Sequence, residues 1–593
     1  MENYIDNNIT YKDKIMFLLN QVSNPSRYMG NEWNSVAKDH RQADLSIALA
    51  FPDLYEVGMS NLGVRILYHL INKREDMLAE RVFTPASDME ELLRREGLPL
   101  FSLETFTPLA EFDLIGFSLQ YELNYTNVLN MLHLSGIPLR SNEREEGPLI
   151  IAGGGCAFNP EPVAPFLDVL VLGDGEEAIL DIMDKVKEAK TKGIPRRELL
   201  VHLAELEGVY VPLLYKLTYD NGYFSGIEAA DSRASLPVGK RVLSDLNEAP
   251  FPEAPVVPYR EIVHDRAVLE VSRGCARGCR FCQAGITYRP RRHRTCEVLK
   301  KQAVNMIKNT GYDELSLASL SSSDHPEIHQ LVKGLSATLP TWVNLSVPSL
   351  RMDSFSVQLS AEVQKTHKSS LTFAPEAGTP RLRKVIKKNI SEENFFDAID
   401  HAFAAGWRMI KLYYMVGLPT ETDEDLEAIA DMVRQVVELY RNRGYREKLK
   451  LSVSASTFSP KPHTPFQWEP MISIEEMRRR QKILARSLKK IKQVNFKWHD
   501  PVTSFLEGVF SRGDRRLADV LEAAWRRGCI FDNWTEHLDW EQWEKAFAET
   551  GLEPQDYACH RYRHIDPLPW DHLNCGMEKE FLIKEHLKSQ EEL

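Results

Sequence analysis

From position 271 to position 285 the chain has the sequence VSRGCARGCRFCQAG, in which Cys275, Cys279 and Cys282 follow an apolar, strand-like run. A structural zinc site needs four ligands, usually from two C-x-x-C pairs that lie well apart. His293 and Cys296 are the next possible ligands, and their spacing does not suit a second pair. A 4Fe–4S cluster normally takes four thiolates, so three cysteines leave one iron open for another ligand. The loop therefore predicts a catalytic metal site held by its three cysteines.

The composition of the whole chain predicts a globular protein of several domains. Its 593 residues exceed what one core organises, and 43% hydrophobic with 27% charged residues is an ordinary globular composition. The net charge of -12 disfavours a general nucleic-acid-coating protein. No signal peptide is evident, and no apolar run approaches the roughly 20 residues that span a bilayer. We therefore expect a cytoplasmic protein without membrane contact, with isolated thiols at Cys156, Cys296, Cys529, Cys559 and Cys575.

Residues 257–480 alternate short apolar runs with helix-period segments. The clearest helix is Asp423–Tyr440, which has one apolar face, acids in its first turn and Thr422 as a capping residue. Repeated strand, helix, strand units are right-handed and form a parallel sheet. Six such units predict a partial (βα)6 barrel, with its chemistry on the loops after the strands. The expected strands are Ala267–Ser272, Glu314–Ala318, Trp342–Val347, Ser370–Ala374, Met409–Met415 and Leu451–Thr457.

A second α/β unit is expected over residues 40–190. Its last two predicted strands run directly into glycine-rich turns, Gly153–Gly155 and Gly173–Gly175. This pattern predicts a flavodoxin-like, doubly wound sheet that binds ligands at the carboxyl ends of its strands. The expected strands are Leu45–Ala50, Leu114–Leu119, Leu149–Ala152 and Val169–Leu172.

The remaining segments connect or flank these two units. We expect an N-terminal helical extension over residues 1–39, a β-rich connector with a proline-rich linker over 191–256, and a mostly helical C-terminal region over 481–593. A helix that starts near Ser473 carries a basic run that includes Arg478, Arg479 and Arg480. That run either binds RNA phosphates or is a solvated face.

The cysteine loop resembles that of the radical S-adenosylmethionine (radical SAM) enzymes. From about residue 45 to residue 585, the order of domains is similar to a radical SAM family with an N-terminal cobalamin-binding-like domain. The barrel resembles the type found in the Elongator catalytic subunit and the methylthiotransferases. The chain has no second cysteine trio and no recognisable TRAM domain, which disfavours methylthiolation.

This resemblance implies a 4Fe–4S cluster whose open iron binds the amino and carboxylate groups of SAM. Reduction then cleaves SAM to a 5′-deoxyadenosyl radical. Phe281 is expected near the adenine of SAM, although it could simply cover the cluster. Ser321 and Ser322 stand where the superfamily has a "GGE"-type motif for the SAM amino group, and this chain lacks its glycines and glutamate.

Two further SAM contacts are implied by the loops after the fourth and fifth barrel strands. Glu376 is placed for the ribose hydroxyls or the amino group of SAM, or else it forms an ion pair with Arg381 or Arg383. Gly417 lies in the segment that flanks adenine in the superfamily, where a glycine lets the backbone approach closely.

For the N-terminal unit, the resemblance implies cobalamin as a further cofactor. Asp53 and Gly58 lie in the loop that in corrinoid domains carries a histidine ligand to cobalt, and no histidine is present there. Ser118, Gly153 and Gly154 match positions that contact the nucleotide tail. The missing histidine leaves two alternatives: cobalamin bound without a protein axial ligand, or a fold that binds none.

The combined prediction is a radical SAM enzyme that abstracts hydrogen from an unactivated C–H bond and, if cobalamin binds, methylates that carbon. The protein would orient the reactants and protect the radical. The resemblance implies SAM and an external electron donor, such as flavodoxin or ferredoxin, as partners. The alternatives are a cobalamin-independent enzyme that modifies RNA or the ribosome, and a non-catalytic iron–sulfur or zinc protein.

Overall fold

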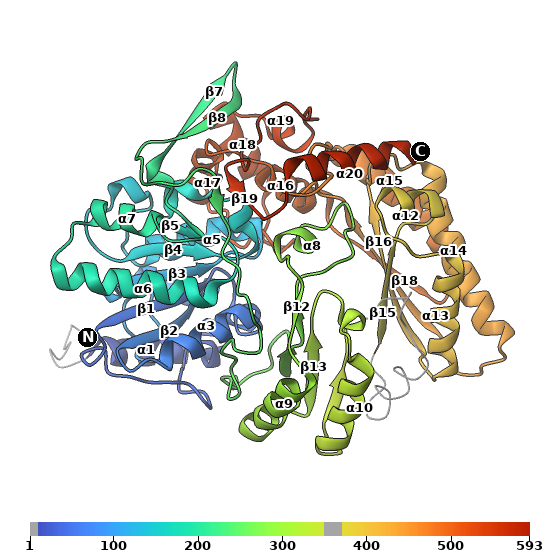
Figure 1. Ribbon diagram of the computed structural model, residues 1–593, viewed down its shortest axis with the longest axis horizontal. Helices are drawn as coiled ribbons and strands as arrows, with labels where there is room; N and C mark the ends of the chain where they lie inside the picture. Colours follow the sequence, from blue (N-terminus) through green and yellow to red (C-terminus); the bar gives the residue numbers. More distant parts are fainter. Residues whose placement is uncertain (1–9, 349–369, 593) are drawn as a thin grey trace, which may run out of the picture.

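The computed structural model describes residues 10–348 and 370–592 (Figure 1). Its first part is a six-stranded sheet in the order β2-β1-β3-β4-β5-β6, parallel except for the antiparallel β6. This order confirms the predicted doubly wound, flavodoxin-like class. The strands are β1 Leu45–Phe51, β2 Met77–Phe83, β3 Leu114–Ser118, β4 Leu149–Gly153, β5 Val169–Val171 and β6 Val209–Tyr210. The helices are α1 Tyr11–Leu18, α2 Tyr55–Gly58, α3 Leu62–Asn72, α4 Ser87–Glu96, α5 Tyr125–Leu134, α6 Gly175–Lys192 and α7 Arg196–Ala204.

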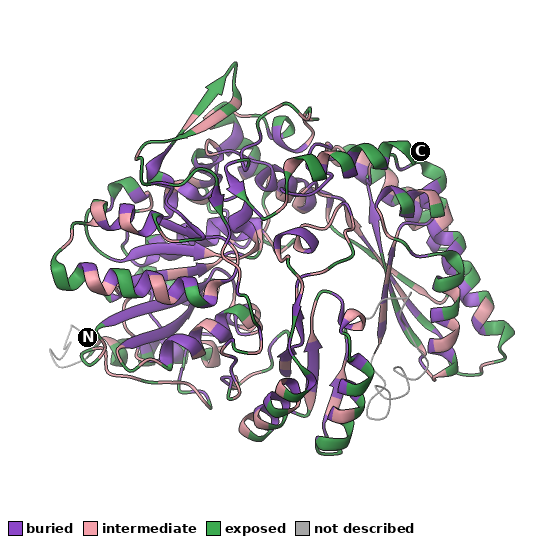
Figure 2. Cartoon of the chain, viewed as in Figure 1, coloured by how far each residue is buried: buried purple, intermediate pink, exposed green. Residues whose placement is uncertain are grey.

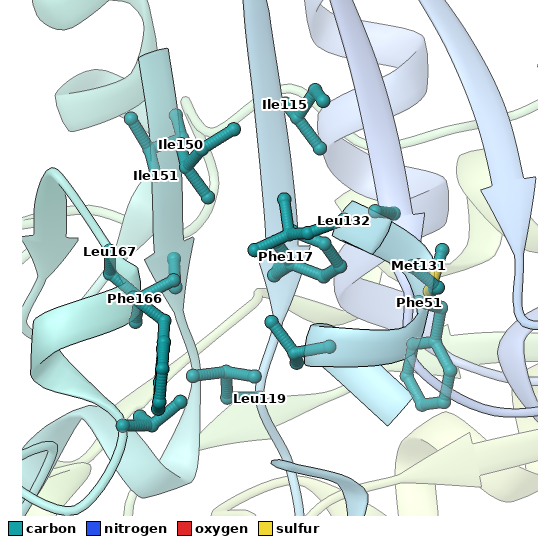
Figure 3. Close-up of a cluster of buried hydrophobic side chains, with 14 of the residues drawn as sticks. Phe51, Ile115, Phe117, Leu119, Met131, Leu132, Ile150, Ile151, Phe166 and Leu167 are labelled. Atoms are coloured by element: carbon teal, nitrogen blue, oxygen red, sulfur yellow. The ribbon is translucent and has the colours of Figure 1, made fainter. Parts of the chain in front are cut away.

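The central strands of this sheet form because they are continuous apolar runs, buried on both faces. Every residue of β1 is buried. Figure 3 shows Phe51, Phe117 and Ile151 of the sheet gathered with Met131 and Leu132 of α5. Full burial of one such side chain contributes about 1.5–3 kcal/mol. Sequence inspection missed β2, which carries two charged residues, Glu80 and Arg81, inside the sheet.

The barrel contains all six strands expected from the sequence. Within the described ranges they form two parallel sheets, β10-β13-β14 and β15-β16-β17-β18, with the break between β14 and β15. The additional strand β18 continues the second sheet beyond residue 480, the expected end of the barrel. Its alternating polar residues made it inconspicuous in the sequence. The strands are β10 Ala267–Glu270, β13 Glu314–Ala318, β14 Asn344–Ser346, β15 Leu371–Glu376, β16 Met409–Val416, β17 Lys450–Thr457 and β18 Val494–Trp498.

Helices cover the outer face of the barrel strands and share a separate core with them. Thr422 caps α14 as predicted, in a capping box with Asp425. Leu412 and Tyr414 of β16 are fully buried in this core, so Lys411 and Tyr413 point to the opposite face of the strand. The helices are α8 Ala284–Thr287, α9 Cys296–Thr310, α10 Ile328–Thr338, α12 Pro380–Val385, α13 Glu392–Ala404, α14 Asp423–Asn442 and α15 Ile474–Leu488.

The C-terminal region is mostly helical, as expected, and folds back onto the N-terminal sheet. Residues of α16 and α17 belong to the same buried cluster as β1, β3 and α5 (Figures 1 and 2). A hairpin, β7 Tyr215–Asp220 and β8 Tyr223–Ala229, projects beside this region with exposed side chains. The remaining elements are β9 Val238–Gly239, β11 Ser272–Arg273, β12 Arg292–His293, α16 Pro501–Ser511, α17 Leu517–Arg526, α18 Trp540–Thr550, α19 Pro554–Ala558, β19 Leu573–Asn574 and α20 Lys579–Glu591.

No helix in the described part of the chain combines the length and apolar character needed to cross a bilayer.

Candidate functional site

The three-cysteine loop follows β10, the first strand of the barrel, as the sequence predicted. It leaves through β11 and returns through β12, which pairs antiparallel with β11. Gly274 adopts φ +83°, and a Cβ there would lie 2.5 Å from the carbonyl oxygen of Tyr288. Only glycine therefore fits this sharp exit from the strand. The arrangement places Cys275, Cys279 and Cys282 at the carboxyl end of the sheet, where barrel enzymes carry their chemistry.

Hydrogen bonds from arginines and one lysine hold the loop in place. Arg289 donates from Nε to the carbonyl oxygen of Gly285 at 2.8 Å, and Lys240 donates to the carbonyl oxygens of Thr287 and Arg289. Arg280 is 2% exposed and donates to the carbonyl oxygen of Val385 at 2.8 Å. The loop is thus held by arginines of the loop and the segment after it, together with Lys240 from a distant part of the chain.

The thiols of the loop suit an iron–sulfur cluster in their chemistry. None of the eight cysteines forms a disulfide, and the three of the loop are partly exposed. Burial raises the pKa of the Cys282 thiol to about 11. Among the described residues, no three His, Cys, Asp or Glu side chains converge as the ligands of one metal ion would. Cysteine thiolates are the usual protein ligands of iron–sulfur clusters, so three thiols in one loop suit a 4Fe–4S cluster.

A cavity of about 420 Å³, here called the main cavity, extends from the cysteine loop into the N-terminal domain. The strands contribute Leu49, Gly116 and Ile151 to its lining, and α3 and α6 contribute further apolar side chains. Gly274 and Tyr288 line its other end, next to the cysteines. The cavity therefore connects the carboxyl ends of the N-terminal strands with the loop that carries the cysteines.

A buried ion network joins the two domains at this cavity. Arg273, directly before the loop, donates to Asp174 at 2.8 Å and to Glu176 at 2.7 Å, both at the start of α6. It also bonds Glu270 at the end of β10. Arg292 pairs with Asp174 as well, and burial is strong for both arginines. These contacts tie the cysteine loop to the turn after β5.

Two arginines that follow the cysteines, Arg292 and Arg294, are buried within the protein. Arg292 is 9% exposed, and Arg294 is fully buried and contacts Glu270 and the ring of Phe251. Neither guanidinium lines the main cavity. Their charges are used within the protein to bind the loop to its surroundings.

Phe281 packs against an apolar group that includes Met415, Leu418 and Phe458 at the ends of β16 and β17. Ser322 is fully buried, and its hydroxyl lies 2.8 Å from that of Ser319. The hydroxyl of Ser321 is buried without a hydrogen-bond partner among the described residues. The loop after β13 thus holds one uncompensated donor beside the main cavity, which Ser319 lines.

Glu376 has φ +68°, a left-handed conformation that is costly for a residue with a side chain. Its carboxylate pairs with Lys388 at 3.1 Å, so the expected alternative pairing with Arg381 or Arg383 is wrong. Arg381 binds Asp425 instead, and Arg383 donates to backbone carbonyl groups. Burial raises the pKa of Glu376.

Position 417 also requires a glycine. Its φ is +88°, and a Cβ would lie 2.9 Å from Ile472. Its N–H donates to the carboxylate of Glu421 at 2.7 Å. The turn after β16 is therefore narrow, because the side chain of Ile472 packs directly against the glycine.

The residues expected to hold cobalamin separate into two groups. Ser118, Gly153 and Gly154 line the main cavity. Asp53 does not, because its carboxylate faces the C-terminal region and accepts hydrogen bonds from Asn533 and Trp534 at 2.7 and 3.1 Å.

Gly58 does not line the main cavity either, and a Cβ there would meet the ring of Phe83 at 2.3 Å. No histidine is among the described residues that line the main cavity.

Several residues of the main cavity escaped the sequence reasoning. Asn61, Gln120 and Tyr288 line it, and their positions carry no motif. Asp174 and Glu176 follow the Gly173 turn, which was recognised as a ligand-binding position without assigning these acids. In the sequence, these residues could have been found only as an acidic pair that follows a glycine at the end of a predicted strand.

The basic helix α15 is partly neutralised within the chain. Arg479 pairs with Asp423 at 2.8 Å and with Glu476, and Arg480 pairs with Glu421 at 2.8 Å. Two of the three consecutive arginines thus bind α14 and its preceding turn.

Comparison with known proteins gives two matching family models. The model "Radical SAM proteins, N-terminal" matches residues 63–212, and "Radical SAM superfamily" matches residues 269–433. An uncharacterized protein of Methanocaldococcus jannaschii is 28% identical over 80% of this chain and 90% of its own length. An uncharacterized methyltransferase of Pyrococcus horikoshii is 22% identical over 50% of this chain and 60% of its own length.

Among solved structures, the radical S-adenosylmethionine methyltransferase TsrM from Kitasatospora setae, with cobalamin and a [4Fe-4S] cluster bound, is 12% identical. The similarity covers 69% of this chain and 74% of that chain, with a TM-score of 0.46. The two family matches fall on the two α/β units described above, and the second begins in β10 and includes the cysteine loop. The chain therefore belongs to the radical SAM superfamily, whose enzymes use a 4Fe–4S cluster and S-adenosylmethionine.

Proposed function

We propose that Cys275, Cys279 and Cys282 hold the 4Fe–4S cluster and leave one iron open for SAM. The observation that carries this proposal is a single loop that presents three thiols, none of them in a disulfide, at the end of the first barrel strand. The bound cluster supplies the electron that cleaves SAM reductively. Arg289 and Lys240 hold the loop in the shape that presents the thiols.

We further propose that the loops beside the cysteines bind SAM. Glu376 and Gly417 lie at the carboxyl ends of neighbouring strands, and Phe281 packs against the same apolar group as Met415. The strained backbone of Glu376 is typical of a functional position. Ser321 offers a hydroxyl that has no hydrogen-bond partner among the described residues, with Ser322 beside it, on the loop after β13. These residues would orient SAM and exclude water from it.

We propose cobalamin as the occupant of the main cavity. The cavity is apolar beside Gly116, a position of β3 that has no side chain. Its rim at the strand ends consists of Ser118, Gly153 and Gly154. A Cβ on Gly154 would lie 2.5 Å from the carbonyl oxygen of Leu119, so the backbone itself forms this rim. These residues would hold the nucleotide tail. When bound, cobalamin supplies a transferable methyl group.

The substrate would then be methylated at an unactivated carbon, held where the main cavity meets the cysteine loop. Gly274, Tyr288 and Leu320 line this end of the cavity. The reaction needs an external one-electron donor such as flavodoxin or ferredoxin. None of the eight cysteines forms a disulfide, which supports a reducing, cytoplasmic environment.

The cluster assignment is tested by anaerobic reconstitution followed by iron quantitation and by 5′-deoxyadenosine formation from SAM with a strong reductant. We expect both to be lost when Cys275, Cys279 and Cys282 are replaced by alanine. Cys296→Ala is the matched control, because that thiol lies on α9 and faces the carbonyl oxygen of Glu327. A cluster that persists in the triple variant would falsify the assignment. A cluster without 5′-deoxyadenosine formation would favour a non-catalytic protein.

The cobalamin assignment is tested separately by incubation with hydroxocobalamin and absorbance of the desalted protein. Gly116→Leu should fill the apolar end of the main cavity, because a Cβ at this position would lie 3.2 Å from the side chain of Ile47. The variant should therefore not retain the corrinoid. Gly239→Leu, in a strand with open space around its Cα, should retain the corrinoid. Equal retention by both variants would rule out this cavity as the site.

A further inference from the structure

A second cavity, of about 250 Å³, lies behind α3 and has no part in the proposed function. It is called the rear cavity here. Helix α3 separates the two cavities: Leu62, Gly63, Ile66 and Leu67 line the main cavity, and residues 64, 65, 68, 69 and 72 line the rear one. Segments of residues 34–36 and 252–256 complete the rear cavity.

The lining of the rear cavity is unbalanced in charge. It includes the cationic side chains of Arg65, Lys73 and Arg81, and no carboxylate is among the described residues that line it. Arg81 is neutralised from outside the lining by Glu32 and Glu104, at 2.7 and 2.6 Å. Lys73 is exposed to solvent, whereas the buried Arg65 forms no ion pair with a described residue, so the cavity favours an anion.

Arg65 is the group that points to a ligand. Its side chain is on α3, is 8% exposed, and donates from Nε to the carbonyl oxygen of Met59 at 2.8 Å. Its Nη2 atom is buried with no hydrogen-bond partner in the described part of the chain. Asp265 acts on it electrostatically without reaching ion-pair distance. A buried guanidinium without a carboxylate is costly, and a bound anion would remove that cost.

The rest of the lining is mostly apolar and defines the other end of the ligand. Val36, Met59, Val64, Pro252 and Val256 contribute aliphatic or thioether surface. Burial lowers the pKa of His69, so this histidine adds no positive charge near neutral pH. A fully charged inorganic anion would gain nothing from these walls, whereas an apolar body would be buried by them.

We propose that the rear cavity binds a small organic carboxylate, with its carboxylate on Arg65 and its apolar body between α3 and residues 252–256. Because α3 forms a wall of both cavities, occupancy of the rear cavity restrains the helix that lines the main one. The site would therefore allow a small metabolite to stabilise one wall of the main cavity.

Calorimetric titration of the full chain with acetate, isovalerate, benzoate and inorganic phosphate tests the proposal. Isovalerate or benzoate should bind more tightly than acetate or phosphate. Arg65→Met should weaken that binding at least about tenfold, as expected for the loss of a charge-assisted hydrogen bond. The melting temperature of ligand-free Arg65→Met should be unchanged or higher, because a buried unpaired charge has been removed.

Arg74→Met is the matched control, since Arg74 follows the same helix, is 36% exposed in ion pairs with Asp76 and Asp184, and does not line the cavity. This variant should bind the ligand as the unmodified protein does. Amide hydrogen exchange gives an independent measurement: the bound carboxylate should slow exchange in α3. Absence of binding by all four probes at millimolar concentration, undiminished binding by Arg65→Met, or unchanged exchange in α3 would each overturn the proposal.

Discussion

Single buried charges determine how the cysteine loop is held, and Arg273 is the clearest case. Its guanidinium is 12% exposed and contacts three carboxylates, those of Asp174, Glu176 and Glu270. Two of these acids belong to the N-terminal domain and one to the barrel. One side chain thus links the domains immediately before the first cysteine.

Replacing Arg273 by methionine should therefore destabilise the protein strongly. The change leaves buried carboxylates uncompensated, which typically costs about 3–5 kcal/mol. We expect a lower thermal midpoint and weaker cluster retention after anaerobic reconstitution. Arg273→Lys should recover part of both. Arg479→Met, which removes exposed ion pairs on α15, is the control and should change the midpoint little; an equal effect of the two variants would contradict this account.

Glu421 makes stability depend on pH in a specific window. Burial raises its pKa from 4.5 to about 7, despite hydrogen bonds from Gly417 and Arg480. The folded state therefore binds this proton more tightly than the unfolded chain does. Its stabilising contribution is complete below about pH 4.5 and is lost as pH rises through about 7.

Replacing the carboxylate of Glu421 should reduce the pH dependence of the protein's folding stability. Glu421→Gln should gain stability relative to the unmodified protein between pH 5 and pH 8, by about 2 kcal/mol at most. Unfolding midpoints of both proteins across that range measure the difference. A constant difference across the range would show that Glu421 does not titrate there.

At the scale of elements, the C-terminal helix α20 contacts the cysteine loop. Glu585 of α20 pairs with Lys387 at 2.9 Å and with Arg280, between the second and third cysteines, at 3.4 Å. His586 of the same helix lies 2.8 Å from Glu469. The end of the chain thus fixes the loop from the side opposite the N-terminal domain.

Glu585→Ala should loosen this contact. Arg280 is 2% exposed and would lose its nearest carboxylate, which we expect to cost about 2–3 kcal/mol. Faster amide exchange in residues 276–283 and faster loss of iron under a chelator should follow. Glu591→Ala, at the exposed end of the helix, serves as the control. Identical exchange in both variants would show that α20 does not restrain the loop.

At the scale of the molecule, the described residues form two large cores, smaller clusters apart, and not one core for each domain expected from the sequence. Residues of α16 and α17 share the N-terminal core, whereas the barrel has its own. Arg515 reaches from the C-terminal region to Glu161 at 2.8 Å, and Asn127 accepts from the N–H of Phe531 at 2.8 Å. The N-terminal and C-terminal regions therefore form one packing unit.

This arrangement predicts fragment complementation. A fragment of residues 1–256 should aggregate alone, because the helix α5 loses its apolar cover from α17. Coexpressed with residues 499–593, it should become soluble, and the two fragments should copurify. A soluble, cooperatively folded 1–256 fragment on its own would contradict the shared core.

Residues close in sequence were enough to predict much of this protein. The cysteine spacing, the barrel strands, the glycine turns after β4 and β5, and the cap of α14 at Thr422 depend on local composition and periodicity. These features appear in the structure where the sequence placed them. The strand β2 was missed because buried charges interrupt its apolar pattern, and those charges find partners far away in the chain.

Only the tertiary structure decided which side chains meet. It paired Glu376 with Lys388, turned Asp53 away from the main cavity, and joined Arg273 to acids about a hundred residues earlier. It also brought the C-terminal helices onto the N-terminal sheet. Sequence patterns report what each segment needs to bury. The partner that satisfies a buried charge or fills a cavity depends on how distant segments pack, which no local pattern encodes.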